Sequence, residues 1–230
     1  MLYFSGNASL SPLYSRKYLF FDLDGTLTDS MPGIARAVQY ALRRFGIDVQ
    51  DLAALKPFLG PPLRDSFMEF YGMSPEEADR AVAVSREYFV PRGMFENELY
   101  PGIPELLAAT AAAGRVNVIA TSKPQPFAER IAAHFGIDRH FRLISGSTFD
   151  GRRKTKADVI RHALSALGIA PGEAVMIGDR RHDVEGAAEE GLPAIAVEWG
   201  YAPPGELEAA RPLRIVPDVE TLRRLLLGNE

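Results

Sequence analysis

The chain has 230 residues, 47% of them hydrophobic, with a formal charge of −4 and no cysteine. It can bury a sizeable core, and its acidic balance argues against a nucleic-acid or anionic-membrane partner. A disulfide framework, a thiol nucleophile and a zinc–thiolate site are excluded. We expect a cytoplasmic protein, either a monomer or a homodimer. Residues 1–16 do not resemble a secretory signal and are predicted to form a flexible segment.

The first predicted element is a short strand that ends in two carboxylates. Tyr18 to Phe21 are four aromatic or aliphatic residues in a row, which is typical of a strand covered on both faces of a parallel sheet. Asp22 and Asp24 follow, and Gly25 breaks the pattern. Strand alternation would point both carboxylates the same way, and such a pair favours a divalent cation with oxygen ligands. A solvated acidic loop is the alternative for this stretch taken alone.

The next part of the chain is predicted to be helical. Apolar residues at helical spacing predict helices at 32–45, 51–58, 63–71 and 75–90. We find no convincing strand between Met31 and Glu98. So long a stretch exceeds a simple crossover between parallel strands and predicts a small inserted helical domain.

This pattern divides the chain into a core and a cap. We predict a core domain made of residues 17–30 and 99–230, and a cap domain made of residues 31–98. Within the cap, the turn at residues 58–64 contains one glycine and two prolines that could hold a fixed loop over a site. Arg64 in this turn is a candidate to bind an anionic or polar substrate tail, with a solvated surface charge as the alternative.

From residue 104 onward, helices and strands alternate. Helices are predicted at 104–113, 126–135, 156–167, 184–190 and 218–227. Strands are predicted at 116–120, 141–144, 174–177, 194–197 and 213–216. This order predicts an α/β protein with a parallel sheet and helices on both faces.

Polar residues gather where these strands end. Ligands of such sheets bind outside the carboxyl ends of the strands. Thr121 and Ser122 follow one predicted strand, Asp179 and Asp183 follow another, and a basic run at residues 152–156 opens a helix nearby. Each of them could be a turn residue or a helix cap, but their placement at equivalent strand ends favours one shared site.

These residue types fit phosphoryl transfer to a carboxylate. An aspartate with an ordinary pKa of roughly 3.9 is ionised at neutral pH and needs no general base to attack phosphorus, a role we assign to Asp22. Mg²⁺ held by Asp22, Asp179 and the Asp24 carbonyl would offset charge repulsion, and Asp183 would reach the ion through water. Asp24 would protonate the leaving alkoxide and then deprotonate the attacking water.

The other phosphoryl oxygens need hydrogen-bond donors. Hydroxyl groups, backbone N–H groups and a lysine ammonium would bind them as charge shifts in the transition state. Lys154 is a competing candidate for this lysine, but Lys156 opens the apolar-periodic helix and has the better defined position. The predicted sets are catalytic Asp22, Asp24, Thr121 and Lys156; substrate-binding Gly25, Thr121, Ser122, Lys156 and Arg64; and metal-binding Asp22, Asp24, Asp179 and Asp183.

Four segments in this order resemble the motifs of the haloacid dehalogenase-like (HAD) hydrolases: Asp22-Leu23-Asp24-Gly25-Thr26, Thr121-Ser122, Lys156, and Gly178-Asp179 with Asp183. The resemblance covers the chain from about Lys17. It implies a Rossmann-like, doubly wound parallel-sheet core with an inserted α-helical cap. Residues 100–103, 121–124 and 156–160 look most like the phosphoglycolate-phosphatase-like branch, which includes members assigned as 5′-nucleotidases. This implies Mg²⁺-dependent hydrolysis of small phosphomonoesters.

Two other functions stay open at this point. A sugar-phosphate mutase resembling β-phosphoglucomutase shares nearly the same motifs and differs mainly in its cap contacts. A receiver-type signalling domain also accepts phosphate on a parallel sheet with acidic residues, Mg²⁺, a Thr or Ser and a Lys. It would need neither a large cap nor the second carboxylate of Asp24. A dehalogenase is disfavoured because it would have no use for Asp24 or Asp179.

Overall fold

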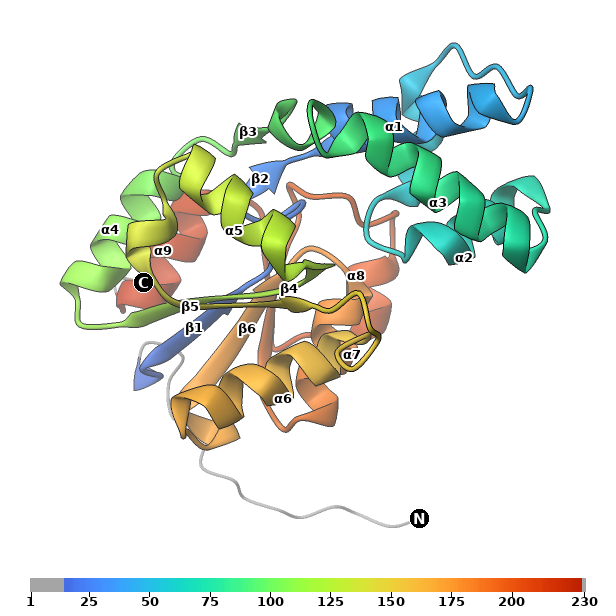
Figure 1. Ribbon diagram of the computed structural model, residues 1–230. Helices are drawn as coiled ribbons and strands as arrows, with labels where there is room; N and C mark the ends of the chain where they lie inside the picture. The colour runs from blue at the N-terminus through green and yellow to red at the C-terminus, as the bar shows by residue number, and fades with distance from the viewer. Residues whose placement is uncertain (1–14, 229–230) are drawn as a thin grey trace.

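A six-stranded parallel sheet forms the centre of the computed structural model, which describes residues 15–228 (Figure 1). Residues 1–14 of the segment predicted to be flexible lie outside this range. The sheet order is β5-β4-β1-β6-β7-β8, and all neighbouring strands are parallel. The strands are β1 (Tyr18–Phe21), β4 (Val116–Pro124), β5 (Phe141–Ser147), β6 (Ala174–Gly178), β7 (Ala194–Val197) and β8 (Arg214–Val216). The predicted α/β fold is confirmed.

Strand β1 lies inside the sheet and is covered on both faces. Leu19 and Phe21 pack into one hydrophobic cluster, while Phe20 packs into the other, as strand alternation requires. One cluster is covered by α4 (Ile103–Ala112), α5 (Gln125–His134) and α9 (Val219–Leu227). The opposite cluster is covered by α6 (Lys156–Leu167), α7 (Arg181–Glu189) and α8 (Glu206–Ala210). The sheet is therefore doubly wound.

An inserted helical segment, residues 31–98, has a hydrophobic cluster of its own. It contains α1 (Met31–Arg44), α2 (Leu63–Tyr71), α3 (Pro75–Phe89) and the 3₁₀ helices η2 (Leu52–Phe58) and η3 (Gly93–Phe95). Its buried residues include Val38, Leu42, Leu55, Phe58 and Phe67, none of which belongs to the clusters that flank the sheet. The helices predicted here are present, with residues 52–58 in the tighter 3₁₀ form.

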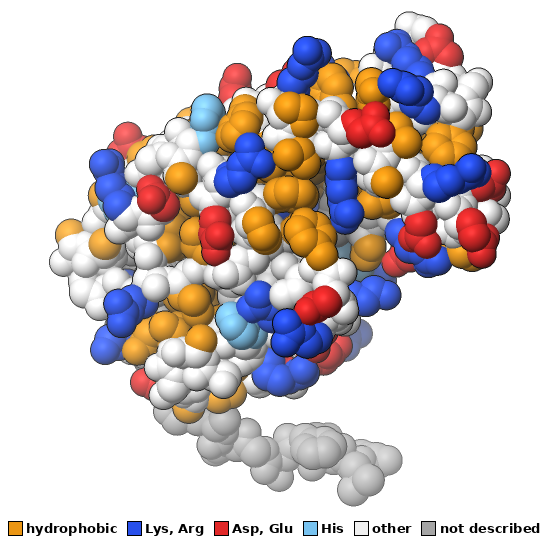
Figure 2. All heavy atoms as spheres, viewed as in Figure 1, with side chains coloured by type: hydrophobic (Ala, Val, Ile, Leu, Met, Phe, Trp, Pro, Cys, Tyr) orange, Lys and Arg blue, Asp and Glu red, His pale blue; other side chains and the backbone are white. Residues whose placement is uncertain are grey.

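Two short strands connect this segment to the rest of the molecule. β2 (Thr28–Asp29) and β3 (Glu98–Leu99) form an antiparallel pair where the chain enters and leaves the segment. A second contact joins α3 to α5, because the rings of Phe89 and Phe127 have centroids 5.7 Å apart. Figure 2 shows hydrophobic side chains gathered between α5 and the inserted segment.

Several boundaries differ from those expected. β4 continues through Pro124 and pairs with β5, which itself extends to Ser147, so the polar residues after residue 120 lie on strand rather than loop. Helix α7 begins at Arg181 instead of residue 184, and α8 was not predicted at all. Short 3₁₀ turns, η4 (Asp138–His140) and η5 (Pro171–Glu173), precede two of the strands. Within residues 15–228, no helix combines the length and apolarity that a bilayer crossing requires.

Candidate active site

The site begins at the tip of β1. The backbone N–H of Asp22 donates to the carbonyl of Ile177 at 2.9 Å, which fixes this tip against β6. The chain then turns at Gly25, whose φ of +84° lies in the left-handed region that favours glycine. A Cβ at Gly25 would also clash with the carboxylate of Asp179. Glycine is therefore required both by the turn and by the close approach of the loop that carries Asp179.

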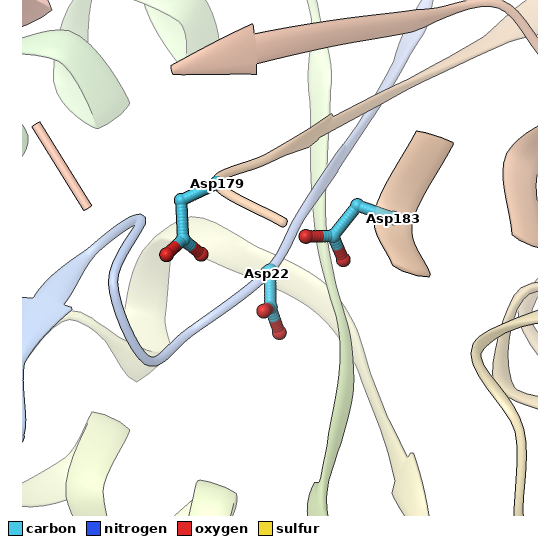
Figure 3. Close-up of side chains that lie close together, drawn as sticks. All are labelled: Asp22, Asp179 and Asp183. Atoms are coloured by element: carbon cyan, nitrogen blue, oxygen red, sulfur yellow. The ribbon is translucent and has the colours of Figure 1, made fainter. Parts of the chain in front are cut away.

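Three carboxylates meet at this edge of the sheet. One oxygen from each of Asp22, Asp179 and Asp183 lies within 4.8 Å of the others. Figure 3 shows that the three side chains approach a common space from separate segments. Asp22 follows β1, Asp179 follows β6, and Asp183 lies in the first turn of α7. The strand-end prediction for these residues thus agrees with the geometry.

Asp179 is completely buried. Its Oδ2 accepts a hydrogen bond from the backbone N–H of Tyr201 at 2.8 Å, and its Oδ1 accepts one from the Thr26 hydroxyl at 3.3 Å. Burial, together with the nearby carboxylates of Asp183 and Asp22, raises the pKa of Asp179 well above its usual value. The negative charge around Asp179 is therefore not balanced by its protein neighbours.

The carboxylate of Asp183 lies against the backbone of residues 178 and 180. Its Oδ2 accepts a hydrogen bond from the N–H of Arg180 at 3.0 Å, as a residue in the first turn of a helix can. A Cβ on Gly178 would clash with the Asp183 carboxylate. Burial raises the pKa of Asp183 to about 6, although Lys156 opposes this effect.

Lys156 supplies the positive charge beside these carboxylates. Its Nζ lies 2.6 Å from Asp183 Oδ1 and 2.9 Å from Asp22 Oδ1, and it donates to the Ala120 carbonyl at 3.1 Å. Burial alone would lower the pKa of Lys156, but the two carboxylates outweigh burial and raise it. Lys154 is exposed. Of the two candidate lysines, the structure therefore brings Lys156 to the acidic cluster.

The end of β4 contributes residues of different exposure. Thr121 is buried, and its Oγ1 accepts a hydrogen bond from the N–H of Lys123, whereas Ser122 is exposed. Lys123 was not predicted as a site residue. Its Nζ lies 2.6 Å from Asp24 Oδ2 and 5.0 Å from the centroid of the Phe89 ring. Strand alternation, which places residues 121 and 123 on the same side, was the signal that could have revealed it.

Two predicted residues lie outside the carboxylate cluster. The side chain of Asp24 pairs with Lys123 instead of joining Asp22, Asp179 and Asp183. Arg64 lies at the start of α2, where its Nε is 2.7 Å from Asp79 Oδ1 on the same inserted segment. Its side chain is 42% exposed, so this contact is a surface ion pair.

The donor set suits a hard divalent cation. The cluster brings together three carboxylate groups, and the ammonium group of Lys156 pairs with two of them, Asp22 and Asp183, which leaves an excess of negative charge when the carboxylates are ionised. Besides burial, the neighbouring carboxylates of Asp183 and Asp22 help to raise the pKa of Asp179. Carboxylate oxygens are the ligands that Mg²⁺ prefers in proteins. Asp22, Asp179 and Asp183 could therefore hold such an ion.

The chain is similar to proteins of known family over most of its length. A family model described as haloacid dehalogenase-like hydrolase matches residues 19–197. The 5′-nucleotidase of Pseudomonas aeruginosa is 48% identical over 90% of this chain and 94% of that protein. The tyrosine-protein kinase PtkA of Mycobacterium tuberculosis is 42% identical over 83% of this chain, and the match spans 65% of that protein. The phosphoglycolate phosphatase of Yersinia pestis is 32% identical over 79% of this chain and 80% of that protein.

A solved structure agrees with these sequence matches. The crystal structure of a predicted phosphatase from Clostridium acetobutylicum has a TM-score of 0.89 and 46% identity, and covers 93% of this chain and 99% of that chain. The sheet order, the strand-end carboxylates and the family match all point the same way. The chain belongs to the haloacid dehalogenase-like hydrolase family.

Proposed function

We propose that this chain is a Mg²⁺-dependent phosphatase of small phosphomonoesters that works through an aspartyl-phosphate on Asp22. The observation that carries the proposal is the position of Asp22. Its side chain, 13% exposed, lies at the tip of β1 with Oδ1 2.9 Å from Lys156 Nζ. Asp179 and Asp183 each bring a carboxylate oxygen within 4.8 Å. The names of the relatives, 5′-nucleotidase and phosphoglycolate phosphatase, support this chemistry over a mutase or a receiver domain.

Asp22 is proposed as the nucleophile. A carboxylate oxygen attacks phosphorus, the bond to the leaving alkoxide breaks, and the phosphoryl group stays on Asp22. The ammonium of Lys156 and the hydroxyl of Thr121 would bind phosphoryl oxygens as charge shifts onto them. Mg²⁺ bound by Asp22, Asp179 and Asp183 would supply electrostatic relief of the repulsion between nucleophile and phosphate.

Asp24 is proposed as the general acid and base. It donates a proton to the leaving oxygen, then takes one from the water that hydrolyses the aspartyl-phosphate. Lys123 holds one of its oxygens, Oδ2, at 2.6 Å. The other, Oδ1, is buried and has no hydrogen-bond partner among the described residues, so it is available for this proton transfer. Lys123 would thus orient the Asp24 carboxylate.

We propose that residues 31–98 act as a cap over a core made of residues 17–30 and 99–230. The separate hydrophobic cluster of the inserted segment and the two-stranded connection β2–β3 support this division. The proposed phosphoryl-binding residues would contact only the phosphate group, so the cap would have to recognise the leaving group. The names of the relatives favour phosphoglycolate or nucleoside 5′-monophosphates as substrates.

The first experiment tests the nucleophile and the metal together. Hydrolysis of p-nitrophenyl phosphate is measured with Mg²⁺ and with excess EDTA, for the parent, Asp22→Asn and Asp24→Asn. We expect no turnover for Asp22→Asn or in EDTA, and for Asp24→Asn a phosphorylated enzyme that hydrolyses slowly. Substantial turnover by folded Asp22→Asn would refute the assigned nucleophile. A panel of AMP, phosphoglycolate and β-glucose 1-phosphate, compared by kcat/KM, then separates phosphatase from mutase activity.

A further inference from the structure

Arg180 reaches from the carboxylate loop of the core to the inserted segment. It lies between Asp179 and Asp183 in the sequence, and its side chain is only 11% exposed. Its Nη1 donates a hydrogen bond to the backbone carbonyl of Leu59, which lies directly after η2. A charged side chain so deeply buried needs complete pairing, and the contacts around Arg180 provide it.

Glu206, in the first turn of α8, fixes the direction of this guanidinium. Arg180 Nε donates to Glu206 Oε1 at 2.8 Å, and Arg180 Nη2 donates to Glu206 Oε2 at 3.1 Å. Such a two-point pair restricts rotation of the guanidinium more than a single hydrogen bond does. Glu206 Oε1 also accepts the backbone N–H of Arg181 at 3.0 Å. The remaining nitrogen, Nη1, is therefore aimed at Leu59 by its partners in the core.

The inserted segment is shaped to receive Arg180. Gly60 has a φ of +104°, and a Cβ at this position would clash with Arg180 Nη1. The neighbouring residue Leu59 is 1% exposed. Phe58, the residue before Leu59, packs its ring against that of Phe67 in α2, with ring centroids 5.1 Å apart. The loop that Arg180 holds is thus anchored in the hydrophobic cluster of the inserted segment.

The backbone of Arg180 has a second task, because its N–H donates to Asp183 Oδ2 at 3.0 Å. One residue consequently holds a carboxylate of the site with its main chain and the inserted segment with its side chain. We propose that Arg180 is a positioning residue that couples the Asp179–Asp183 loop to the loop at residues 58–62. It would keep this loop of the inserted segment fixed beside the Asp179–Asp183 loop, and so contribute to substrate selection by the proposed cap. This inference rests on the proposed phosphatase function.

The coupling can be tested without any activity, by amide hydrogen exchange of the substrate-free protein. In Arg180→Gln, we expect exchange in the peptide covering residues 56–60 to rise by about tenfold or more, because a hydrogen bond from a charged group is lost. Exchange in β1 and β6 should stay unchanged. Arg181→Gln, at the exposed neighbouring position, is the matched control and should leave residues 56–60 protected. Unchanged exchange of this peptide in Arg180→Gln would overturn the inference.

A variant on the opposite side of the contact guards against general misfolding. Gly60→Ala leaves Arg180 and Asp183 intact but places a methyl group against Arg180 Nη1. It should release the same peptide as Arg180→Gln does. Faster exchange throughout the core in both variants, instead of in residues 56–60, would show that Arg180 merely supports the fold and would also overturn the inference.

The kinetic readout addresses substrate selection. For the ester with the highest kcat/KM, Arg180→Gln should raise KM by about tenfold while kcat falls much less, because binding of the leaving group is weakened. Arg180→Lys, which keeps the charge but not the two-point pair with Glu206, should recover part of this loss. A fall in kcat of about tenfold with unchanged KM would contradict the positioning role. If the parent hydrolyses no ester, the proposed function fails, while the exchange experiment still decides the coupling.

Discussion

Replacing Lys156 with methionine removes an ammonium group that contacts both Asp22 and Asp183. Methionine keeps a similar length and apolar volume, so the loss is mainly electrostatic. The Lys156 side chain is 4% exposed, and its Nζ lies 2.6 Å from Asp183 Oδ1 and 2.9 Å from Asp22 Oδ1. Its removal leaves two carboxylates without their cation in a buried place, next to a third on Asp179.

The size of the effect follows from this burial. Removing one partner of a buried ion pair costs about 3–5 kcal/mol in the free energy of unfolding. We expect the lower end, about 3 kcal/mol, because water can still reach the Asp22 side chain, which is 13% exposed. For a chain of this size, such a loss lowers Tm by about 6–12 °C. Loss of the proposed contact between Lys156 and the phosphoryl group should also lower kcat by roughly a hundredfold or more.

Thermal unfolding is measured in EDTA, so that a bound cation does not replace the lost charge, and hydrolysis is measured in Mg²⁺. Lys154→Met is the matched control, since this lysine lies two residues earlier in the chain and is exposed. It should keep the parent's Tm and kcat. A Lys156→Met protein within roughly 2 °C of the parent's Tm would show that the carboxylates do not depend on this ammonium, and would refute the electrostatic argument.

Two further substitutions test the supports of the site. Gly178→Ala should lower kcat by about a hundredfold, because its Cβ would displace the Asp183 carboxylate and small misplacements of this kind are costly. Gly172→Ala, where a Cβ would meet nothing within 4 Å, is the control. Asp158→Ala should cost about 1 kcal/mol near pH 7, because it removes the Asp158 half of the capping box that Thr155 and Asp158 form at the start of α6. Hydrogen bonds from the N–H groups of Thr155 and Lys154 lower the pKa of Asp158 to about 2, so this stabilisation is present above about pH 4 and lost between about pH 4 and 2.

The two predictions are checked by kcat for the glycine variants and by urea unfolding for Asp158→Ala. If Gly178→Ala has the same kcat as Gly172→Ala, displacement of the Asp183 carboxylate does not affect the reaction, and the prediction is wrong. Urea midpoints of Asp158→Ala and the parent, compared from pH 7 to pH 2, should converge at the acid end. A gap that stays constant over this range would contradict the role of the ionised carboxylate.

The elements with local signals at both ends were predicted best. Helix α6 spans Lys156–Leu167 as expected, because Thr155 caps its start and Gly168, with a φ of +65°, ends it. Strands β2 and β3 were missed, since each has two residues and exists only through pairing with a distant part of the chain. Helix α8 has five residues and begins at Glu206, whose partner is Arg180. Contacts of this kind leave no periodic pattern in the sequence.

The same distinction applies to the site. The carboxylates could be predicted to meet because the carboxyl ends of parallel strands lie at one edge of the sheet. Strand alternation could have placed Lys123 on the same side of β4 as Thr121, but it could not reveal the contact with Phe89 of the inserted segment, whose ring centroid lies 5.0 Å from Lys123 Nζ. Arg180 was likewise hidden, since its target is the backbone carbonyl of Leu59. Every residue has a backbone carbonyl, so the sequence does not show which of them Arg180 contacts.

The position of β1 between β4 and β6 affects when the protein becomes reactive. Phe21 pairs with Ile119 on one side and with Ile177 on the other, so the strand that carries Asp22 is complete only after both distant partners have been synthesised. Pairings between such distant segments form late in folding, whereas the helices of the inserted segment pack on near neighbours in the chain. A chain that is still on the ribosome and ends before β6 lacks Asp179 and Asp183 as well. Chains that end before β6 should therefore be inert, and the proposed nucleophile gains its surroundings only after β6 and the start of α7 have been synthesised.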